Sequence, residues 1–194
     1  MGKIPKKSHG DGSPQRFSDE VAGQLYSNNT RFWSFQEHLP RKVNTTRSSQ
    51  SFFGWYAMQG KSLLTELKGG KVADIQQALL AIKEANNEYD CMVIFWDNAK
   101  THKALETWGW ERQIYFIPIP SYSPNLNPLE RLWKPLKKSV NETQFVKGLN
   151  DLTRLYQQGF SMLQSKLSFM DSWWEHFKVS LSWYSTIFDS NTIP

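Results

Sequence analysis

Apolar and polar positions in the first half of the chain follow patterns typical of strands and of one helix. Residues 51–58 and 62–67 are strand-like, and Gln59-Gly60 between them supplies a turn glycine, which predicts a hairpin. From Val72 to Ile82 the apolar residues recur every three or four positions. This spacing predicts an amphipathic helix that ends near residue 86.

Two later runs are apolar on both faces. Residues 91–96 and 114–119 are rich in β-branched and aromatic side chains, which favours central strands covered by helices on both sides. The segment between them can form a short helix over residues 102–110. This alternation of helix and strand predicts an α/β fold.

A further helix is predicted to begin at Asn127, a residue type that caps helices well. Pro128 then takes the first helical position and Glu130 the third. Pro135 is expected to kink this helix or stop it early, because proline lacks the backbone N–H. The apolar residues of the helix share one face: Leu129, Leu132, Trp133, Leu136 and Val140.

The composition is that of one soluble domain with a moderate positive charge. At 194 residues the chain can build a core of its own. The single cysteine, Cys91, excludes a disulfide within the chain and a zinc site of several thiolates. The longest apolar run, residues 91–96, is far shorter than the ~18 residues that cross a bilayer. The net charge of +5 permits an anionic partner such as nucleic acid.

Two acidic residues occupy positions that suit chemistry. Asp97 ends an apolar strand, and ligands in open α/β sheets gather at the carboxyl ends of strands, although an Asp-Asn pair can also simply start a turn. Glu130 has the alternative role of a favourable helix-start residue. The segment before it, residues 120–128, contains three prolines, so that a stiff loop delivers Glu130. A rigid loop suits a carboxylate that must be held for metal chemistry.

The two acidic segments resemble a known family. Asp-Asn-Ala-Lys-Thr-His at 97–102 and Pro-Ser-Tyr-Ser-Pro-Asn-Leu-Asn-Pro-Leu-Glu-Arg-Leu-Trp at 120–133 closely resemble the catalytic domain of mariner-type DDE transposases, with the bacterial insertion-sequence branch as the nearest match. The separation, 130 − 97 = 33 positions, fits that family's spacing. The resemblance covers about residues 17–165.

The resemblance implies a ribonuclease H-like fold, in which helices flank a mixed five-stranded sheet and three acids converge on two Mg²⁺ ions, for which Mn²⁺ can substitute. Asp97 matches the second acid and Glu130 the third. Asp19 resembles the first acid, with Asp11 as a weaker candidate. The residues that follow Asp19 in the family's order are Trp33, Arg47 and Phe53-Gly54. Hard cations prefer oxygen ligands, and three carboxylates close together are expected to have raised, coupled pKa values without metal.

The resemblance also implies DNA partners, namely transposon ends and target DNA, a homodimer on DNA and a cytoplasmic, nucleoid-associated location in a prokaryote. His102 is a candidate for contacting phosphate or supporting the metal site, or a helix-start histidine without a role. Four basic residues fit a phosphate-contacting surface, although a plain solvated helix face is the alternative: Arg131, Lys134, Lys137 and Lys138.

Two features depart from the family's pattern. The family carries N-terminal helix-turn-helix domains that bind DNA, whereas only 18 residues precede Asp19, so we expect a detached catalytic half. A first strand that leads up to Asp19 would include the polar residues 8–16 and Pro14, which predicts a poorly formed strand. The predicted organisation is a disordered lead (1–16), the catalytic domain (17–165) and a C-terminal helical extension (166–194), with helices at about 144–166 and 169–188.

These observations leave three hypotheses of function. The leading one is a metal-dependent transposase domain that cleaves transposon ends and joins them to target DNA. The second is a non-catalytic remnant that keeps the fold and acts as a DNA-binding or interaction module. The third is a general ribonuclease H-like nuclease acting on hybrids or flaps, which the proline-rich segment before Glu130 disfavours.

Overall fold

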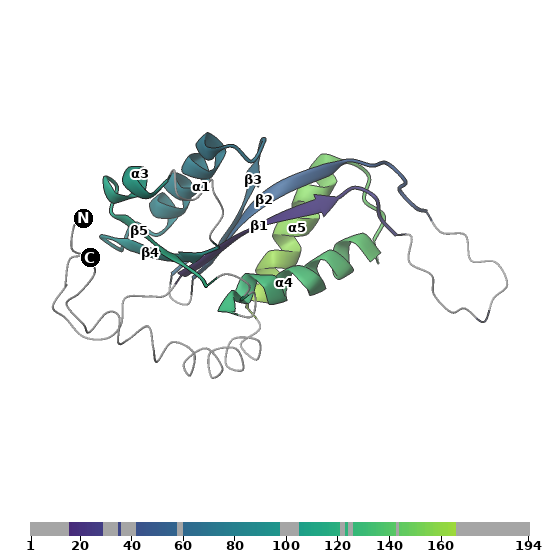
Figure 1. Ribbon diagram of the computed structural model, residues 1–194. Helices are drawn as coiled ribbons and strands as arrows, with labels where there is room; N and C mark the ends of the chain where they lie inside the picture. The colour runs from purple at the N-terminus through teal and green to yellow at the C-terminus, as the bar shows by residue number, and fades with distance from the viewer. Residues whose placement is uncertain are drawn as a thin grey trace.

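The computed structural model contains a five-stranded mixed sheet with helices on both faces (Figure 1). The description below covers residues 16–28, 35, 42–57, 60–97, 105–120, 123, 126–142 and 144–165. The predicted lead of residues 1–16 lies outside this part except for Arg16, and the predicted extension of residues 166–194 lies outside it completely.

The strand order in the sheet is β3-β2-β1-β4-β5. The strands β1 (Arg16–Gln24), β2 (Ser49–Ala57) and β3 (Leu63–Leu67) pair in antiparallel fashion. β4 (Met92–Trp96) runs parallel to β1, and β5 (Ile114–Pro118) runs parallel to β4. The expected mixed five-stranded sheet is thereby confirmed, as is the hairpin, whose Gly60 has a positive φ of 100°.

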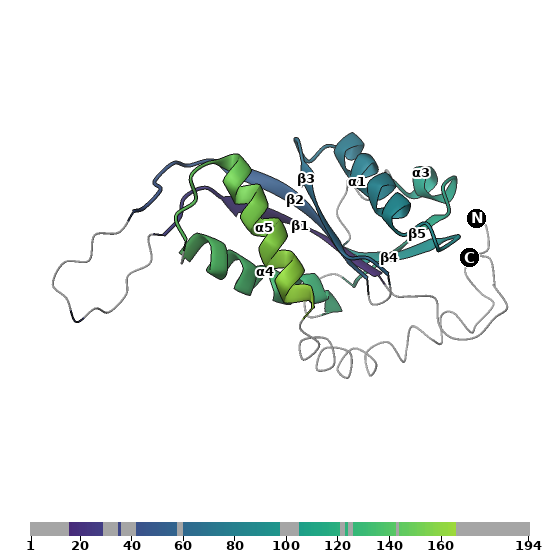
Figure 2. The ribbon, with the colours of Figure 1, turned by 180° about the vertical axis from the view of Figure 1, so that it is seen from behind.

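Each face of the sheet is covered by a pair of helices. α1 (Val72–Ala85) and α3 (Glu106–Trp110) lie on one face, and α4 (Pro128–Lys137) and α5 (Leu149–Gln164) lie on the other (Figure 2). Because side chains alternate along a strand, the core divides into two clusters. Along β2, for example, Phe52 and Tyr56 pack toward α4 and α5, whereas Phe53 and Trp55 pack toward α1.

The first strand differs from the sequence expectation. Instead of leading up to Asp19 from residue 8, β1 begins at Arg16 and continues past Asp19 to Gln24. Its inward residues, such as Phe17 and Val21, are 0% and 4% exposed. The prediction of a poorly formed strand is wrong, because the apolar residues that anchor this strand lie on both sides of Asp19 rather than only before it. The strand begins two positions after Pro14 in the sequence, so the described strand contains no proline.

Pro135 does not stop α4. The helix continues to Lys137 and passes into a π-helical turn, η2 (Lys138–Glu142). Pro135 lies on the exposed side of the helix, where water can satisfy the carbonyl that its missing N–H leaves unbonded.

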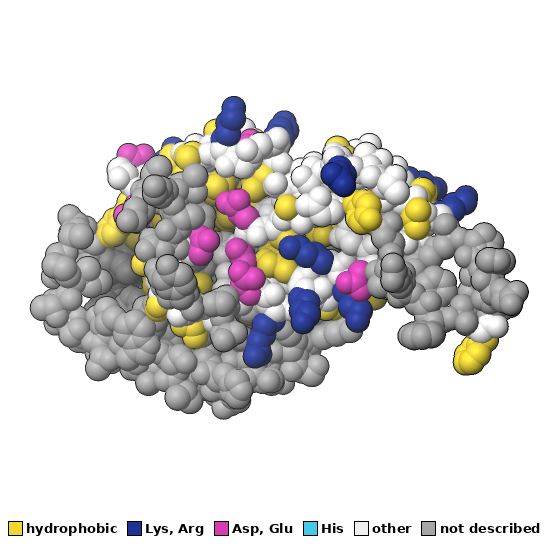
Figure 3. All heavy atoms as spheres, turned by 45° about the vertical axis from the view of Figure 1, so that its right-hand side comes forward, with side chains coloured by type: hydrophobic (Ala, Val, Ile, Leu, Met, Phe, Trp, Pro, Cys, Tyr) yellow, Lys and Arg dark blue, Asp and Glu magenta, His cyan; other side chains and the backbone are white. Residues whose placement is uncertain are grey.

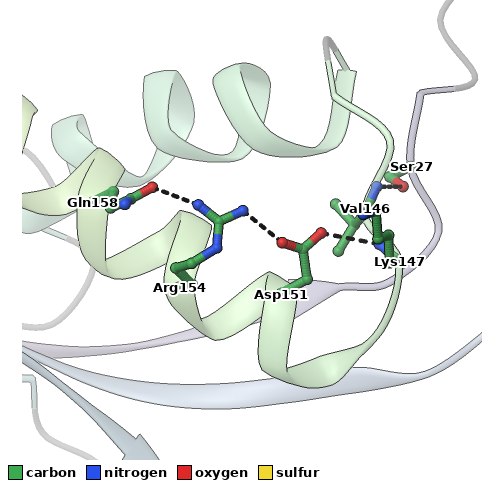
Figure 4. A network of polar contacts seen from close by, with 6 residues as sticks. All are labelled: Ser27, Val146, Lys147, Asp151, Arg154 and Gln158. Carbon is green, nitrogen blue, oxygen red and sulfur yellow. Dashed lines mark hydrogen bonds and ion pairs between the residues drawn. The ribbon is translucent and has the colours of Figure 1, made fainter.

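The next helix, α5, begins at Leu149, five positions later than predicted. Asp151 in its first turn accepts a hydrogen bond from the backbone N–H of Lys147 at 3.1 Å and pairs with Arg154 at 2.6 Å (Figure 4). The backbone N–H of Val146, just before this helix, donates to the Ser27 hydroxyl at 3.1 Å. This hydrogen bond fixes the segment that leads into α5 to the segment around Ser27, just after β1. Within the described residues no helix is long and apolar enough to cross a membrane.

Candidate active site

Asp19 and Asp97 lie at corresponding places on neighbouring parallel strands. The register pairs Arg16 with Ile94 and Phe17 with Phe95, so that Asp19 and Asp97 follow two residues beyond the last pair. Side chains two positions apart on a strand point to the same face of the sheet, so Asp19 and Asp97 share the face of Phe17 and Phe95. The side chains of these two phenylalanines pack in the cluster beneath α4 and α5. The sheet therefore aims both carboxylates toward the face on which α4 begins.

Asp19 is mostly buried and holds its carboxylate in two hydrogen bonds. Its Oδ1 accepts from the backbone N–H of Glu20 at 2.9 Å, and its Oδ2 accepts from the indole Nε1–H of Trp133 at 2.9 Å. Burial raises the pKa of Asp19 to about 7 against the lowering effect of these hydrogen bonds. The charges of Glu130 and Asp97 raise this pKa further, so both of these acids lie within electrostatic reach of Asp19. The expected raised pKa is thus confirmed for Asp19.

Asp97 is exposed directly beyond the buried end of β4. The strand fixes its position because all five residues of β4 pair with β5, and Ile94 and Phe95 also pair with β1. The following residues, 98–104, lie outside the described part of the chain, and so does the proposed contact residue His102.

Glu130 stands in the first turn of α4, as predicted. Asn127 is the N-cap: its Oδ1 accepts from the backbone N–H of Leu129 at 3.1 Å, and Pro128 follows at the first helical position. The same side chain donates from Nδ2 to the backbone oxygen of Ser18 at 3.2 Å. Since Ser18 directly precedes Asp19, Asn127 anchors the start of α4 to the strand that carries Asp19.

The three acids offer oxygen donors of the kind that Mg²⁺ and Mn²⁺ prefer. A cation would stabilise the charged form of Asp19, a mostly buried carboxylate whose pKa is raised by burial and, to a lesser degree, by its acidic neighbours. These donors fit a hard divalent ion in their chemistry. Their side chains are not already gathered around one point, since no group of three or more His, Cys, Asp or Glu poised to hold a metal occurs in the described part of the chain.

A groove of about 950 Å³ runs beside Glu130 between α4, η2 and the end of β1. Figure 3 shows acidic side chains gathered on this face, with Lys and Arg side chains beside them. Three of the four candidate DNA-contacting residues line the groove, namely Lys134, Lys137 and Lys138, and Arg131 does not. The groove is completed by Arg47, Glu142 and uncharged residues: Ala22, Gln24, Tyr26, Trp133, Asn141 and Tyr156.

Two residues near Asp19 were not identified from the sequence as part of the site. Trp133 was assigned to the apolar face of its helix and to the end of the motif that resembles the family, and Gly54 was noted only for its place in the family's order. An ideal Cβ on Gly54 would come within 2.3 Å of Cη2 of Trp133, so the glycine leaves room for the indole. A glycine inside a strand pattern is the signal that indicates such a close approach.

Comparisons with known proteins identify the family and the fold. Residues 14–153 match the family described as DDE superfamily endonuclease. The fold is similar to that of the mariner Mos1 paired-end complex with Mg (TM-score 0.58, 17% identity, covering 86% of this chain and 55% of that chain). It is also similar to the Mos1 strand transfer complex (TM-score 0.53, 17% identity, covering 85% and 54%). The corresponding complex with Mn has a TM-score of 0.56 at 15% identity and covers 85% and 55%.

The chain thus spans about 55% of the length of these solved proteins. The comparisons support a ribonuclease H-like fold for the sheet and its helices. A comparison with curated protein sequences finds no match.

Proposed function

Because the chain belongs to the DDE superfamily endonucleases, we propose that it is the catalytic domain of a mariner-like DNA transposase, which cleaves transposon ends and joins them to target DNA. The observation that carries the proposal is the placement of the acids: Asn127 fixes the start of α4, which has Glu130 in its first turn, to the strand that carries Asp19, and Asp97 follows the neighbouring parallel strand at the corresponding position. Burial, above all, and the charges of Glu130 and Asp97 raise the pKa of Asp19 to about 7, and perturbed pKa values of this kind are common at functional sites.

In this proposal Asp19, Asp97 and Glu130 hold two Mg²⁺ ions, for which Mn²⁺ can substitute. When bound, these ions activate a hydroxyl nucleophile and stabilise the leaving oxygen of a phosphodiester. The solved Mos1 complexes with Mg and with Mn support this choice of metal. Asn127 keeps Glu130 near Asp19 by fixing the start of α4 to β1.

The groove beside Glu130 supports DNA as the partner. Lys134, Lys137 and Lys138 place three positive charges along it, and Arg47 adds a fourth. Side chains of this kind bind phosphates without reading base sequence, so that they would hold a DNA backbone close to the three acids. The Mos1 structures, which are paired-end and strand transfer complexes, are consistent with this partner.

The assignment to the bacterial insertion-sequence branch, the homodimer on DNA, the cytoplasmic location in a prokaryote and the lack of a helix-turn-helix region stay predictions from the sequence resemblance. So do the domain limits at residues 17–165. The role of Arg131, which lies outside the groove, stays a prediction as well.

The test combines metal binding with DNA cleavage. Mn²⁺ uptake by the full chain is measured by calorimetry, and nicking of supercoiled plasmid is measured in Mg²⁺ and in Mn²⁺. Asp97→Asn and Glu130→Gln should abolish both. Glu106→Gln is the matched control, because Glu106 is an exposed acid on α3, on the opposite face of the sheet, and this variant should behave as the wild type.

Nicking that survives both substitutions would overturn the assignment of the acids. DNA binding without any Mn²⁺ uptake would instead favour the alternative, a non-catalytic DNA-binding or interaction module. Cleavage confined to RNA–DNA hybrids would favour a general ribonuclease H-like nuclease.

A further inference from the structure

Trp133 lies across the strand pair that carries the first acid. Its side chain is 4% exposed, and its ring stacks near Phe160 of α5 with centroids 6.0 Å apart. The same ring reaches β1, where Nε1 donates to Oδ2 of Asp19. The indole therefore connects the apolar core beneath α4 to the acidic site.

Gly54 makes this position of the ring possible. In the antiparallel register Gly54 lies directly opposite Asp19, on the face toward α4. An ideal Cβ there would come within 2.3 Å of Cη2 and 2.6 Å of Cζ2 of the indole, which is closer than real Cβ contacts allow. A glycine within a strand carries an entropic cost, and here it leaves the space that the indole occupies.

The two hydrogen bonds on Asp19 fix the carboxylate as a whole. The N–H of Glu20 occupies one position on Oδ1, and the indole N–H occupies one position on Oδ2. Each carboxylate oxygen has two lone pairs, so each keeps one for a further partner. With both oxygens held, the side chain cannot rotate about its terminal bond without breaking one of the two bonds.

We propose that Trp133 is a positioning residue of the acidic site: its indole N–H holds the Asp19 carboxylate in the orientation that receives a divalent cation, and Gly54 leaves the space that this requires. The inference rests on the proposed metal-dependent function. Partners of metal-binding carboxylates that fix their orientation commonly change metal affinity about 10- to 100-fold when they are removed. Packing alone would not need the N–H group, because a phenyl ring fills most of the same space.

The experiment compares two Trp→Phe substitutions. Trp133→Phe removes the donor and keeps an aromatic ring in the core. Trp55→Phe is the matched control: Trp55 is the next residue after Gly54, is 0% exposed on the opposite face, and its Nε1 has no hydrogen-bond partner among the described residues. Mn²⁺ affinity is measured by calorimetry on the full chain, and the Mn²⁺ concentration for half-maximal plasmid nicking is measured in parallel.

We expect Trp133→Phe to weaken Mn²⁺ binding about 10-fold or more. The Mn²⁺ requirement of nicking should rise in step, while the KM for DNA stays unchanged and high Mn²⁺ restores much of kcat. A variant that had merely lost folded protein would lower the amplitude of binding at every Mn²⁺ concentration without changing affinity. Trp55→Phe should bind Mn²⁺ as the wild type does.

A second measurement covers the case in which Trp133→Phe does not fold. In the wild-type chain the assigned indole ¹H–¹⁵N resonance of Trp133 should shift when Mg²⁺ is added, and the Trp55 resonance should not. The positioning role would be overturned if Trp133→Phe and the wild type bound Mn²⁺ with equal affinity, or if the Trp133 resonance did not shift when Mg²⁺ is added. Either outcome would leave the proposed function intact. If the wild type itself binds no Mn²⁺, the proposed function fails first.

Discussion

Asn127 donates a hydrogen bond to the backbone oxygen of Ser18, a residue 109 positions earlier in the chain. The same side chain caps α4 by accepting from the N–H of Leu129. One buried amide, 4% exposed, thus fixes the start of the helix and its place beside β1. The relative position of Asp19 and Glu130 depends on it.

Two substitutions at Asn127 distinguish the contribution of the helix cap from that of the hydrogen bond to Ser18. Asn127→Ala removes both hydrogen bonds and should lower the free energy of unfolding by about 2–3 kcal/mol, since it loses a cap and leaves a buried carbonyl without its donor. Asn127→Ser keeps a good N-cap and loses only the contact with Ser18, so that it should recover roughly 1 kcal/mol. Urea unfolding checks both. Equal losses in the two variants would show that the cap contributes nothing.

The raised pKa of Asp19 makes the stability of the metal-free protein depend on pH. The folded pKa of about 7 exceeds the usual 3.8, so the folded state binds the proton more tightly than the unfolded state. The resulting stabilisation is complete below the unfolded pKa and is lost as pH rises through about 7. At ~1.4 kcal/mol per pKa unit, and with partial solvent exposure of the side chain, the loss should be on the order of 2–4 kcal/mol.

Asp19→Asn should therefore raise the free energy of unfolding at about pH 8 and flatten its pH dependence in the presence of a chelator. Asp151→Asn is the control, because the pKa of Asp151 is lowered, chiefly by its hydrogen bond to Arg154, and its contribution is lost only on the acid side. Addition of Mg²⁺ should stabilise the wild type more at pH 8 than at pH 5, since protons compete with the ion. A wild-type profile that rises from pH 5 to pH 8 would contradict the environment described for Asp19.

Gly54→Ala tests the space beneath the indole. The added methyl group would overlap with the ring of Trp133, and relief of this overlap has to shift either the helix or the strand. We expect a loss of about 1–3 kcal/mol in the free energy of unfolding, measured in urea. Gly69→Ala is the matched control, since a Cβ there would meet only Oδ2 of Asp74 at an ordinary 3.5 Å. A neutral Gly54→Ala would mean that the ring moves aside without cost.

The lysines of the groove should determine how DNA binding depends on salt. Each of Lys134→Gln, Lys137→Gln and Lys138→Gln that removes one phosphate contact should reduce the slope of log K against log salt concentration by about 0.9 on duplex DNA. Fluorescence anisotropy over a series of salt concentrations measures this slope.

Two further variants test whether the effect is specific to the groove. Lys68→Gln removes the same charge from an exposed position after β3 and should leave the slope unchanged. Arg131→Gln tests the exposed helix face outside the groove. A reduction by Arg131→Gln as large as that of the lysines would move the DNA path from the groove to the whole outer face of α4.

Local signals were sufficient to predict where the chain places Asp97 and Glu130. The cap at Asn127 and the proline after it mark the start of α4, and a short apolar run marks the strand that ends at Asp97. These signals are local because they depend on backbone hydrogen bonds within a few residues.

The surroundings of Asp19 could not be predicted in the same way, because they depend on contacts between distant segments. The hydrogen bond from Trp133 joins residues 114 positions apart, and nothing in the helical pattern distinguishes an apolar tryptophan from one that also donates. The first strand was placed on the wrong side of Asp19, since its apolar residues Phe17 and Val21 are separated by three polar ones, of which only Glu20 is exposed. The start of α5 was placed too early, because Gly148 forms its N-cap without a side-chain signal.

The antiparallel half of the sheet (β1–β3) and the parallel half (β4 and β5) meet where β1 pairs with β4, and this pairing, here called the seam, is short. Between β1 and β4 the register holds two pairs within the described residues, Arg16 with Ile94 and Phe17 with Phe95. The rings of Phe17 and Phe95 stack with centroids 5.1 Å apart, directly behind the two aspartates. Asp19 belongs to the antiparallel half and Asp97 to the parallel half, so the width of the seam sets the spacing between them. A smaller side chain at Phe17 would therefore remove the ring contact that supports this spacing without altering a single charge.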